Sequence, residues 1–429
     1  MTVSRRRMLQ GGAAVGGGAG LGWSGGAAAA LVGERSSAGA ATPAAPVRVA
    51  PPPGAEVVPF HGAHQAGVAT EPQAFAVFLG LDLRAASEDP GAAREQLVRL
   101  LRLLTDDAVR LTAGRPALGD TEPELAVLPA RLTVTIGLGP RVLTELTRTR
   151  VPLRPLPAFS IDRLEDRWGQ TDLLIQLGCD DPLTLAHARR MLLKDAAAFA
   201  RLRWAQEGFR RARGTEAPGT TMRNVLGQVD GTANPNPADG DFADLLWATA
   251  QDPGGPAFAG GTFCVLRRIR AELVTWDAVG RAGKEFAVGR RLDTGAPLTG
   301  ERETDPLDLA AVDALGLPVI DAGAHVRRAR SDDPRQRFLR RPYNYVTSDP
   351  SAPDGQEAGL LFAAYARDVE RQFVPIQQRL AELDRLNQWV TPVGSAVYAI
   401  PPGLAAPSSD PGAAASDPTV DFLGRTLFA

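Results

Sequence analysis

Cysteine and histidine are scarce in this chain, and their scarcity limits the chemistry that it can perform. The 429 residues include two cysteines and four histidines. Cys179 and Cys264 form no Cys-x-x-Cys pair, which excludes a zinc ribbon and a thioredoxin-type redox pair. One disulfide between them stays open, although two small buried thiols are the simpler interpretation. A histidine-rich metal site is excluded, and any imidazole-dependent mechanism must use one of four positions: His61, His64, His187 or His325.

Concentrated charge of one sign is missing as well. Lysine and arginine total 47 against 49 aspartates and glutamates, which gives a formal net charge of −2. No basic run occurs beyond the first few residues, whereas nucleic-acid binders carry a basic face. We therefore expect no nucleic-acid partner. The length, with 44% hydrophobic residues, suffices for two domains with sizeable cores.

Residues 1–40 have the pattern of an export signal. Arg5 and Arg6 in "SRRRMLQGG" precede a Gly/Ala-rich, mildly apolar stretch, and small residues follow in "SSAGAATPA". The apolar stretch is too short and too rich in glycine for a membrane span. The order Ser-Arg-Arg-x-x-Leu resembles the twin-arginine signal, which implies passage through the twin-arginine translocase. The expected location is periplasmic, extracellular or in the cell envelope.

The rest of the chain alternates strand-like and helix-like segments in two rounds. A Pro/Ala-rich linker over residues 41–56 is followed by a predicted N-terminal domain over residues 57–223. Its strands and helices alternate from "FAVFLGLDL" to "PLTLAHARRMLLKDAAAFARL". The rhythm restarts after residue 260 with "TFCVLRRIRAEL" and closes with "GSAVYAIP", in a predicted C-terminal domain over residues 224–429. The sequence therefore predicts two α+β domains.

Two polar stretches of the second domain are candidates for chemistry. In "GQVDG" followed by "TANP", Asp230 is either a turn former or a reactive acid, and Gly231 would let the backbone approach a bound group closely. His325 lies in the long segment 286–345, and loops of that length are usually functional. Many arginines follow His325 up to "FLRRPYNY". They suit a large anionic cofactor, and a basic surface loop is the alternative.

"GQVDG" with "TANP", "AHVRRA" and "FLRRPYNY", in this order, resemble the dye-decolourising peroxidase family of haem enzymes. Further segments over residues 57–402 support the resemblance, among them "EFAVGRRLDTGAPLTG" and "TPVGSAVYAIPPG". The resemblance is to the twin-arginine-exported branch, which includes deferrochelatase/peroxidases. It implies two ferredoxin-like domains of the dimeric α/β-barrel-like superfamily, with haem b in the C-terminal domain. A homo-oligomer is compatible with it.

The resemblance also implies an activity, the reduction of hydrogen peroxide with oxidation of organic donors such as dyes or phenols. Two alternatives stay open: a deferrochelatase that releases iron from haem, and a non-catalytic haem-binding protein. With no thiol motif for attachment, we expect the haem to be held non-covalently.

Four residues receive principal roles from the resemblance. His325 is the expected axial ligand of the haem iron, and Asp384 in "LAELDRLNQW" is the acid expected beside its other ring nitrogen. On the opposite face, Asp230 would move the peroxide proton. Arg340 would keep that face positive and stabilise developing negative charge.

Other matching residues are expected to contact the haem or to line its approach. The haem contacts are Gly231, Thr232, Ala233, Arg290, Arg330 and Arg340. The chain reads Ala329-Arg330-Ser331 where the family has Ala-Asn-Pro, which makes the contact at Arg330 uncertain. Leu360 and Phe362 would wall the peroxide channel or simply pack in the core. Candidates for carrying oxidising equivalents to bulky dyes are aromatic: Trp247, Trp276, Trp389, Tyr345 and Tyr398.

Overall fold

The computed structural model describes residues 52–84, 89–350, 352, 355–406 and 421–429. The predicted export signal and most of the predicted linker lie outside these residues. The described end of the linker is attached to the protein, because the carbonyls of Gly54 and Glu56 accept hydrogen bonds from the N–H groups of Ala130 and Arg131. In the described part of the chain, no helix has the length and apolar character needed to cross a membrane.

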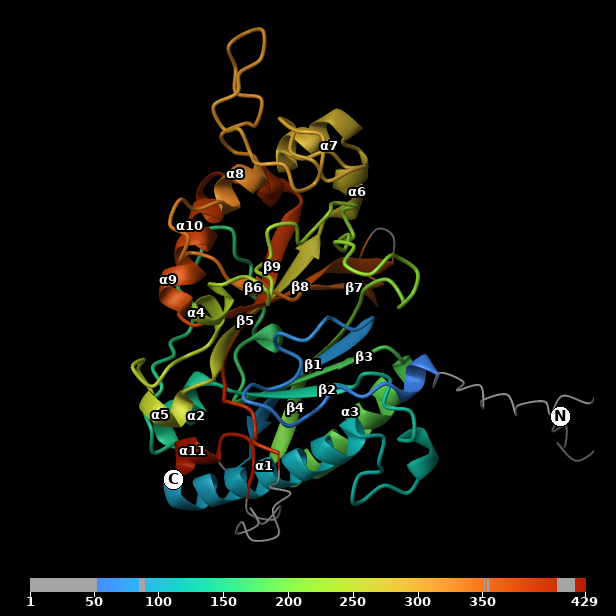
Figure 1. The fold of residues 1–429 in the computed structure, drawn as a ribbon, viewed down its shortest axis with the longest axis vertical. Helices are drawn as coiled ribbons and strands as arrows, with labels where there is room; N and C mark the ends of the chain where they lie inside the picture. The colour runs from blue at the N-terminus through green and yellow to red at the C-terminus, as the bar shows by residue number, and fades with distance from the viewer. Residues whose placement is uncertain (1–51, 85–88, 351, 353–354, 407–420) are drawn as a thin grey trace, which may run out of the picture. The chain divides into compact units, whose positions relative to one another are not determined.

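The N-terminal half has the strand–helix–strand order of a ferredoxin-like fold. Its elements are η1 (Pro53–Ala55), β1 (Phe75–Leu83), α1 (Pro90–Thr112), η2 (Pro123–Leu125), β2 (Thr133–Leu138), α2 (Pro140–Glu145), η3 (Asp166–Trp168), β3 (Leu173–Cys179), α3 (Pro182–Ala196) and β4 (Ala200–Phe209). The strands pair antiparallel in the order β2-β3-β1-β4. Helices α1 and α3 lie side by side over one face of these strands (Figure 1).

Local sequence explains where the two long helices begin. Asp89 accepts hydrogen bonds from the N–H groups of Gly91 and Ala92 at the start of α1. Asp181 accepts one from Thr184 at the start of α3. Both helices have proline at the first helical position, where its missing N–H costs nothing. Five leucines of α1 recur at helical spacing and are buried: Leu97, Leu100, Leu101, Leu104 and Leu111.

The C-terminal half repeats the same strand order. Its elements are α4 (Phe242–Leu246), α5 (Gly255–Phe258), β5 (Thr262–Ala271), α6 (Leu273–Asp277), α7 (Arg281–Val288), α8 (His325–Ala329), β6 (Leu339–Arg340), β7 (Tyr343–Ser348), β8 (Gln356–Ala366), α9 (Val369–Gln372), α10 (Val374–Leu383), η4 (Arg385–Gln388), β9 (Val390–Ile400) and α11 (Arg425–Phe428). The strands pair antiparallel in the order β7-β8-β5-β9, and β6 also pairs with β8. The long segment between α7 and α8 projects beyond both helices (Figure 1).

The two four-stranded sheets join at both edges into a closed barrel. One seam is the pairing of Leu138 in β2 with Ala399 in β9, and the other pairs Phe209 in β4 with Asn344 in β7. Side chains from both sheets fill the interior, while the helices cover the outer faces. The expected pair of ferredoxin-like domains is confirmed, and together they form one barrel.

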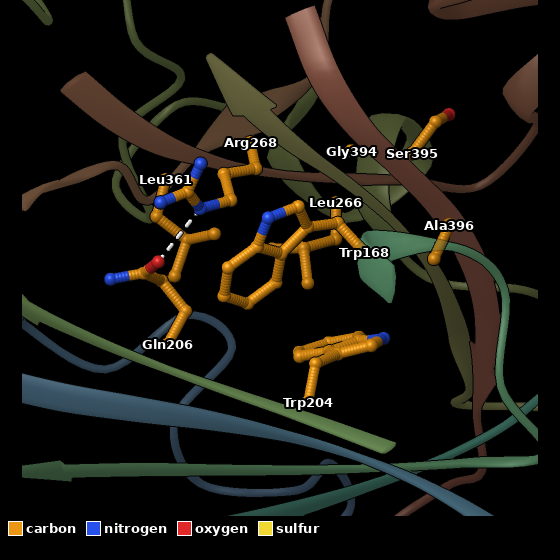
Figure 2. A pocket seen from close by; sticks show the side chains of 9 residues that line it. All are labelled: Trp168, Trp204, Gln206, Leu266, Arg268, Leu361, Gly394, Ser395 and Ala396. Atoms are coloured by element: carbon orange, nitrogen blue, oxygen red, sulfur yellow. Dashed lines mark hydrogen bonds between the residues drawn. The ribbon is translucent and has the colours of Figure 1, made fainter. Parts of the chain in front are cut away.

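A buried charge shows how tightly the barrel interior is filled. Arg268 on β5 is buried and pairs with Glu357, and its guanidinium lies over the rings of Trp168 and Tyr345, 4.2 and 4.3 Å from their centroids. Figure 2 shows Arg268 donating to Gln206 beside a cavity of about 10 Å³. A cavity of this size holds about one water molecule and no cofactor.

Strand β8 separates this interior from the helical layer of the C-terminal half. Leu361, Ala363 and Tyr365 belong to the interior cluster. Leu360 and Phe362 alternate with them and therefore point outward, where both are half-buried. The outer face of β8 is the face on which the polar candidates of the second domain gather.

The last described residues return to the N-terminal half. The N–H of Leu423 donates to Thr105 on α1, and the N–H of Arg148 donates to the carbonyl of Leu427. Residues 421–429 thus pack against the first half although they follow the second in sequence. The domain limits expected from the sequence stay predictions.

Both cysteines are buried free thiols, so the disulfide alternative is wrong. Cys179 ends β3 and Cys264 lies in the barrel interior. Burial raises the pKa of each thiol to about 12. Neither is suited to nucleophilic or redox chemistry.

Two carboxylates meet between α1 and α3. Asp107 is buried on α1 and accepts a hydrogen bond from the N–H of Leu118 at 2.8 Å. Burial, together with the charge of Asp107 and a hydrogen bond to it, raises the pKa of Asp195 on α3 to about 8. The nearby charge of Lys194 acts in the opposite direction and Asp106 in the same direction. The pair therefore retains a proton in the folded protein near neutral pH.

This proton makes stability depend on pH. An unfolded aspartate has a pKa near 3.9, so the stabilisation is complete below about pH 4 and is lost as the pH rises to about 8. Asp195→Asn removes this dependence. The free energy of unfolding of the variant relative to wild type should rise between pH 5 and pH 8, by at most about 1.4 kcal/mol per pH unit. Urea unfolding at both pH values measures it, with the exposed Asp277→Asn as control. A difference that does not change with pH contradicts the prediction.

Candidate active site

His325 begins the short helix α8 in the long segment before β6. Its Nδ1 lies 2.6 Å from Oδ2 of Asp384, the residue that follows α10. The other oxygen of Asp384 accepts a hydrogen bond from the N–H of Leu386 at 2.9 Å and caps η4. Because α8 and α10 pack together, two segments 59 residues apart place the imidazole and the carboxylate in contact.

The environment of His325 leaves one ring nitrogen available. The side chain of His325 is 35% exposed, and its Nε2 has no hydrogen-bond partner among the described residues. Burial lowers the pKa of His325, but the charge and hydrogen bond of Asp384 and the charge of Asp230 outweigh it, so the net pKa is raised. In the neutral ring, Nδ1–H donates to Asp384 and the lone pair of Nε2 stays free for a metal.

Asp230 lies in the tight turn that the sequence indicates. Its N–H donates to the carbonyl of Met222, and the N–H of Asn234 donates to the carbonyl of Gly231. Gly231 has φ +142°, and a Cβ added there would come 3.1 Å from the side chain of Thr221. A side chain at this position would therefore be strained as well as crowded.

Asp230 and Arg340 form an ion pair. Oδ1 of Asp230 lies 2.9 Å from Nη1 of Arg340, and its Oδ2 accepts from Nδ2 of Asn224 at 3.3 Å. The two side chains are 13% and 24% exposed. Both act electrostatically on His325, Asp230 raising and Arg340 lowering the pKa of the imidazole. The structure thus brings His325, Asp384, Asp230 and Arg340 into one site.

Two of the expected haem contacts, Thr232 and Arg290, are held by hydrogen bonds to neighbouring residues. Thr232 donates to Oε1 of Glu303 at 2.8 Å. Arg290 donates to the carbonyls of Gly295 and Glu303 at 2.7 and 2.9 Å. Burial lowers the pKa of Arg290, Glu303 raises it, and the charge of Arg340 lowers it further, which places Arg290 near the ion pair.

The four remaining expected residues are exposed or lie on the outer face of β8. Ala233 and Arg330 are exposed, and the side chain of Arg330 has no hydrogen-bond partner among the described residues. Leu360 is half-buried on the outer face of β8. Phe362 on the same face packs edge-on against Phe338, 6.3 Å between ring centroids, so it contributes to the core.

The other histidines and the aromatic candidates are held by the protein itself. His187 pairs with Asp120 in the N-terminal half. His64 stacks on Trp247 with 3.7 Å between ring centroids and contacts the carbonyl of Gly260. The remaining aromatic candidates are buried or half-buried: Trp276, Trp389, Tyr345 and Tyr398. Their part in electron transfer stays a prediction.

Comparison with known proteins identifies the family. The family model "Dyp-type peroxidase, N-terminal" matches residues 65–210, and "Dyp-type peroxidase, C-terminal" matches residues 221–405. A dye-decolorizing peroxidase of Thermobifida fusca (strain YX) is 39% identical over 351 residues, which cover 79% of this chain and 81% of that protein. The chain belongs to the dye-decolourising peroxidase family. It is a haem peroxidase that reduces hydrogen peroxide and oxidises organic donors.

Other relatives of this peroxidase include deferrochelatases. That of Escherichia coli (strain K12) is 32% identical over 388 residues, covering 85% of this chain and 88% of that protein. Among solved structures, a DyP-type peroxidase from Cellulomonas bogoriensis is 48% identical with a TM-score of 0.80, covering 88% of this chain and 99% of the other. Ferric DtpA from Streptomyces lividans is 36% identical with a TM-score of 0.78, covering 89% and 100%.

The residues present fit a haem. The free Nε2 of His325 suits a haem iron, which takes one imidazole nitrogen from the protein in many peroxidases. Arg290, Arg330 and Arg340 offer positive charge for its carboxylates, and the outward face of β8 offers half-buried apolar surface. Neither buried thiol is suited to covalent attachment, which agrees with non-covalent binding.

Sequence reasoning missed three polar residues of this peroxidase site. Asn224 and Asn234 flank the Asp-Gly turn and bind the side chain of Asp230 and the backbone of Arg340. Asn234 stood in the quoted "TANP" and could have been noticed. Glu303 accepts hydrogen bonds from Thr221 and Thr232 with the same oxygen. Nothing in its local sequence distinguishes it from the other charges of the long segment.

Asp384→Asn should weaken haem binding. The amide keeps an oxygen for the N–H of Leu386, so η4 remains capped, but it loses the negative charge that makes the imidazole a stronger ligand. Such changes cost about 10- to 100-fold in affinity. Haem transfer to apomyoglobin measures the loss, with the exposed Glu382→Gln on α10 as matched control. Equal transfer rates for wild type and Asp384→Asn would remove Asp384 from haem binding.

Proposed function

We propose that this peroxidase uses His325 as its axial ligand and Asp230 and Arg340 as its peroxide-cleaving pair. The observation that carries the proposal is that the site holds two carboxylates, each of which contacts a different kind of side chain. Asp384 contacts the imidazole, whereas Asp230 contacts a guanidinium. Each carboxylate therefore has the partner that its proposed role needs.

The haem, when bound, supplies the redox-active iron that exchanges electrons with peroxide and with the donor. Asp230 accepts the proton from one peroxide oxygen and gives it to the other, which leaves as water. Arg340 pairs with Asp230 and stabilises the negative charge that develops on the leaving oxygen. Reduction of one hydrogen peroxide to two water molecules takes two electrons and two protons, and the organic donor provides the electrons.

His325 and Asp384 act on the opposite side of the site. The hydrogen bond at Nδ1 fixes the orientation of the ring and keeps Nε2 directed away from Asp384. A partly negative imidazole favours the more oxidised states of a metal. In this proposal, His325 with Asp384 would donate electron density to the metal, and Asp230 with Arg340 would transfer the proton.

A deferrochelatase activity is the second candidate. It is supported by relatives that bear this name and match 85% or more of this chain. It would use the same residues around His325. Incubation of the haem-loaded protein under reducing conditions, with chromatography of the extracted pigment, distinguishes it: iron-free porphyrin with an intact ring supports this activity, and unchanged haem argues against it.

Export by the twin-arginine translocase is part of the proposal. Arg5 and Arg6 support it, and such export would take the folded enzyme to the periplasm, the cell envelope or the outside of the cell. Replacement of both by lysine should keep the protein in the cytoplasm, as fractionation would show. If the variant with both lysines is still exported, the proposed export route is overturned and the proposed catalytic roles are unaffected. A homo-oligomer is also proposed on the strength of the resemblance, and light scattering tests it.

Replacement of Asp230 and of His325 should have separable effects. Asp230→Asn keeps the shape but cannot accept a proton, so the haem stays bound and the reaction with peroxide slows by about 10²- to 10⁴-fold. His325→Ala should instead lose haem. Stopped-flow absorption with hydrogen peroxide measures the first effect, and the haem-to-protein absorbance ratio measures the second.

Asp239→Asn, an exposed change in the same loop, is the matched control for Asp230→Asn. If Asp230→Asn reacts with peroxide as fast as wild type, Asp230 is not the proton carrier. If His325→Ala retains haem with an unchanged spectrum, the axial ligand is another residue.

A further inference from the structure

Arg340 is carried by an unusually short strand. β6 has two residues, which pair with Tyr365 and Ala364 of β8. The N–H of the next residue, Arg341, donates to the carbonyl of Ala363, so its backbone faces β8. In an antiparallel pair, neighbouring residues direct their backbone groups to opposite sides. The N–H and C=O of Arg340 therefore point away from β8, to the open edge of the strand.

The side chain of Asn234 occupies that open edge. Its Oδ1 accepts from the N–H of Arg340 at 2.7 Å, and its Nδ2 donates to the carbonyl of Arg340 at 2.9 Å. These are the two hydrogen bonds that a neighbouring strand would make. A side-chain amide has the acceptor and the donor on two separate atoms of one planar group, as a backbone peptide group does.

The same residue closes the turn that carries the acid. The backbone N–H of Asn234 donates to the carbonyl of Gly231 at 2.8 Å, and Gly231 directly follows Asp230 in the sequence. Asn234 thus connects the turn of Asp230 to the backbone of Arg340, 106 residues later. The guanidinium of Arg340 has no hydrogen-bond partner among the described residues besides Asp230, so the backbone largely determines where it lies.

We propose that Asn234 is a positioning residue for peroxide cleavage: its double hydrogen bond holds Arg340 in register with Asp230. The inference rests on the function proposed above for the Asp230–Arg340 pair. It predicts that loss of the side chain lets β6 shift on its free edge while Asp230 and Arg340 both remain present. The reaction with peroxide should then slow only because Arg340 is misplaced.

Hydrogen exchange tests the contact without any activity measurement. In Asn234→Ala the amide of Arg340 loses its acceptor and should exchange faster, whereas the amide of Arg341, bonded to Ala363, should stay protected. Asn236→Ala is the matched control, since among the described residues this exposed asparagine of the same loop forms hydrogen bonds within its own turn alone, with Ala238 and Asp239. If the amide of Arg340 exchanges at the same rate in Asn234→Ala as in wild type, the double hydrogen bond does not hold Arg340 and the proposal is overturned.

A double-mutant cycle with Arg340→Ala tests the function. On the haem-loaded protein, Asn234→Ala should slow the reaction with hydrogen peroxide by about tenfold, the effect expected from two hydrogen bonds. In the Arg340→Ala background it should have no further effect, because the guanidinium it positions is gone. Equal effects of Asn234→Ala in both backgrounds would show a general structural role and overturn the proposal. Cyanide affinity of the ferric protein, measured in the same four variants, should follow the same non-additive pattern.

The cycle also separates failure of the inference from failure of the proposed function. If Arg340→Ala itself leaves the peroxide rate unchanged, the assignment of Arg340 fails. If Arg340→Ala slows the reaction and Asn234→Ala does not, only the positioning role fails. Should Asn234→Ala not fold, Asn234→Asp takes its place in the cycle, because it retains the acceptor for Arg340 N–H and loses the donor to the carbonyl; it too should be slow only when Arg340 is present.

Discussion

The ion pair between Asp230 and Arg340 is the interaction on which the geometry of the site depends. Its partners are 110 residues apart, one on a turn before β5 and the other on the last residue of β6. Both side chains are mostly removed from water, and a partly buried charge is tolerated when it is paired and hydrogen-bonded. The turn, β6 and the sheet that carries it must therefore keep a fixed relation for either charge to be accommodated.

Asp384 meets the same requirement, that a buried charge be paired and hydrogen-bonded, with different partners. Asp384 is almost fully buried and has its two oxygens bonded to the imidazole of His325 and to the N–H of Leu386. Burial alone would lower the pKa of His325, and the neighbouring carboxylates reverse the direction. The two acids thus differ in partner, an imidazole for Asp384 and a guanidinium for Asp230, and this difference is what the two roles proposed for them require.

Sequence pattern predicts the local elements well and their assembly poorly. The leucine spacing of α1 and the buried runs of β2 and β3 identify those elements because burial sets their periodicity. The closed barrel depends on two single pairings, Leu138 with Ala399 and Phe209 with Asn344, and neither has a signal in the chain. In the site, His325 and Asp230 stand out by motif, whereas Asp384 is one of several acids around α10. Glu303 and the two asparagines act through backbone and side-chain contacts that only the fold creates.

The amount of structure devoted to Asp230 bears on what the site is for. A protein that merely holds haem needs the axial ligand and apolar surface, and it gains nothing from a second carboxylate on the other face. Here Arg340 and Asn224 bind the two oxygens of Asp230, and Asn234 fixes the backbone of Arg340. Holding these polar groups away from water costs free energy that binding alone does not recover. The arrangement suits a site where a proton is taken and returned at a fixed place, as the peroxide cleavage proposed for Asp230 requires.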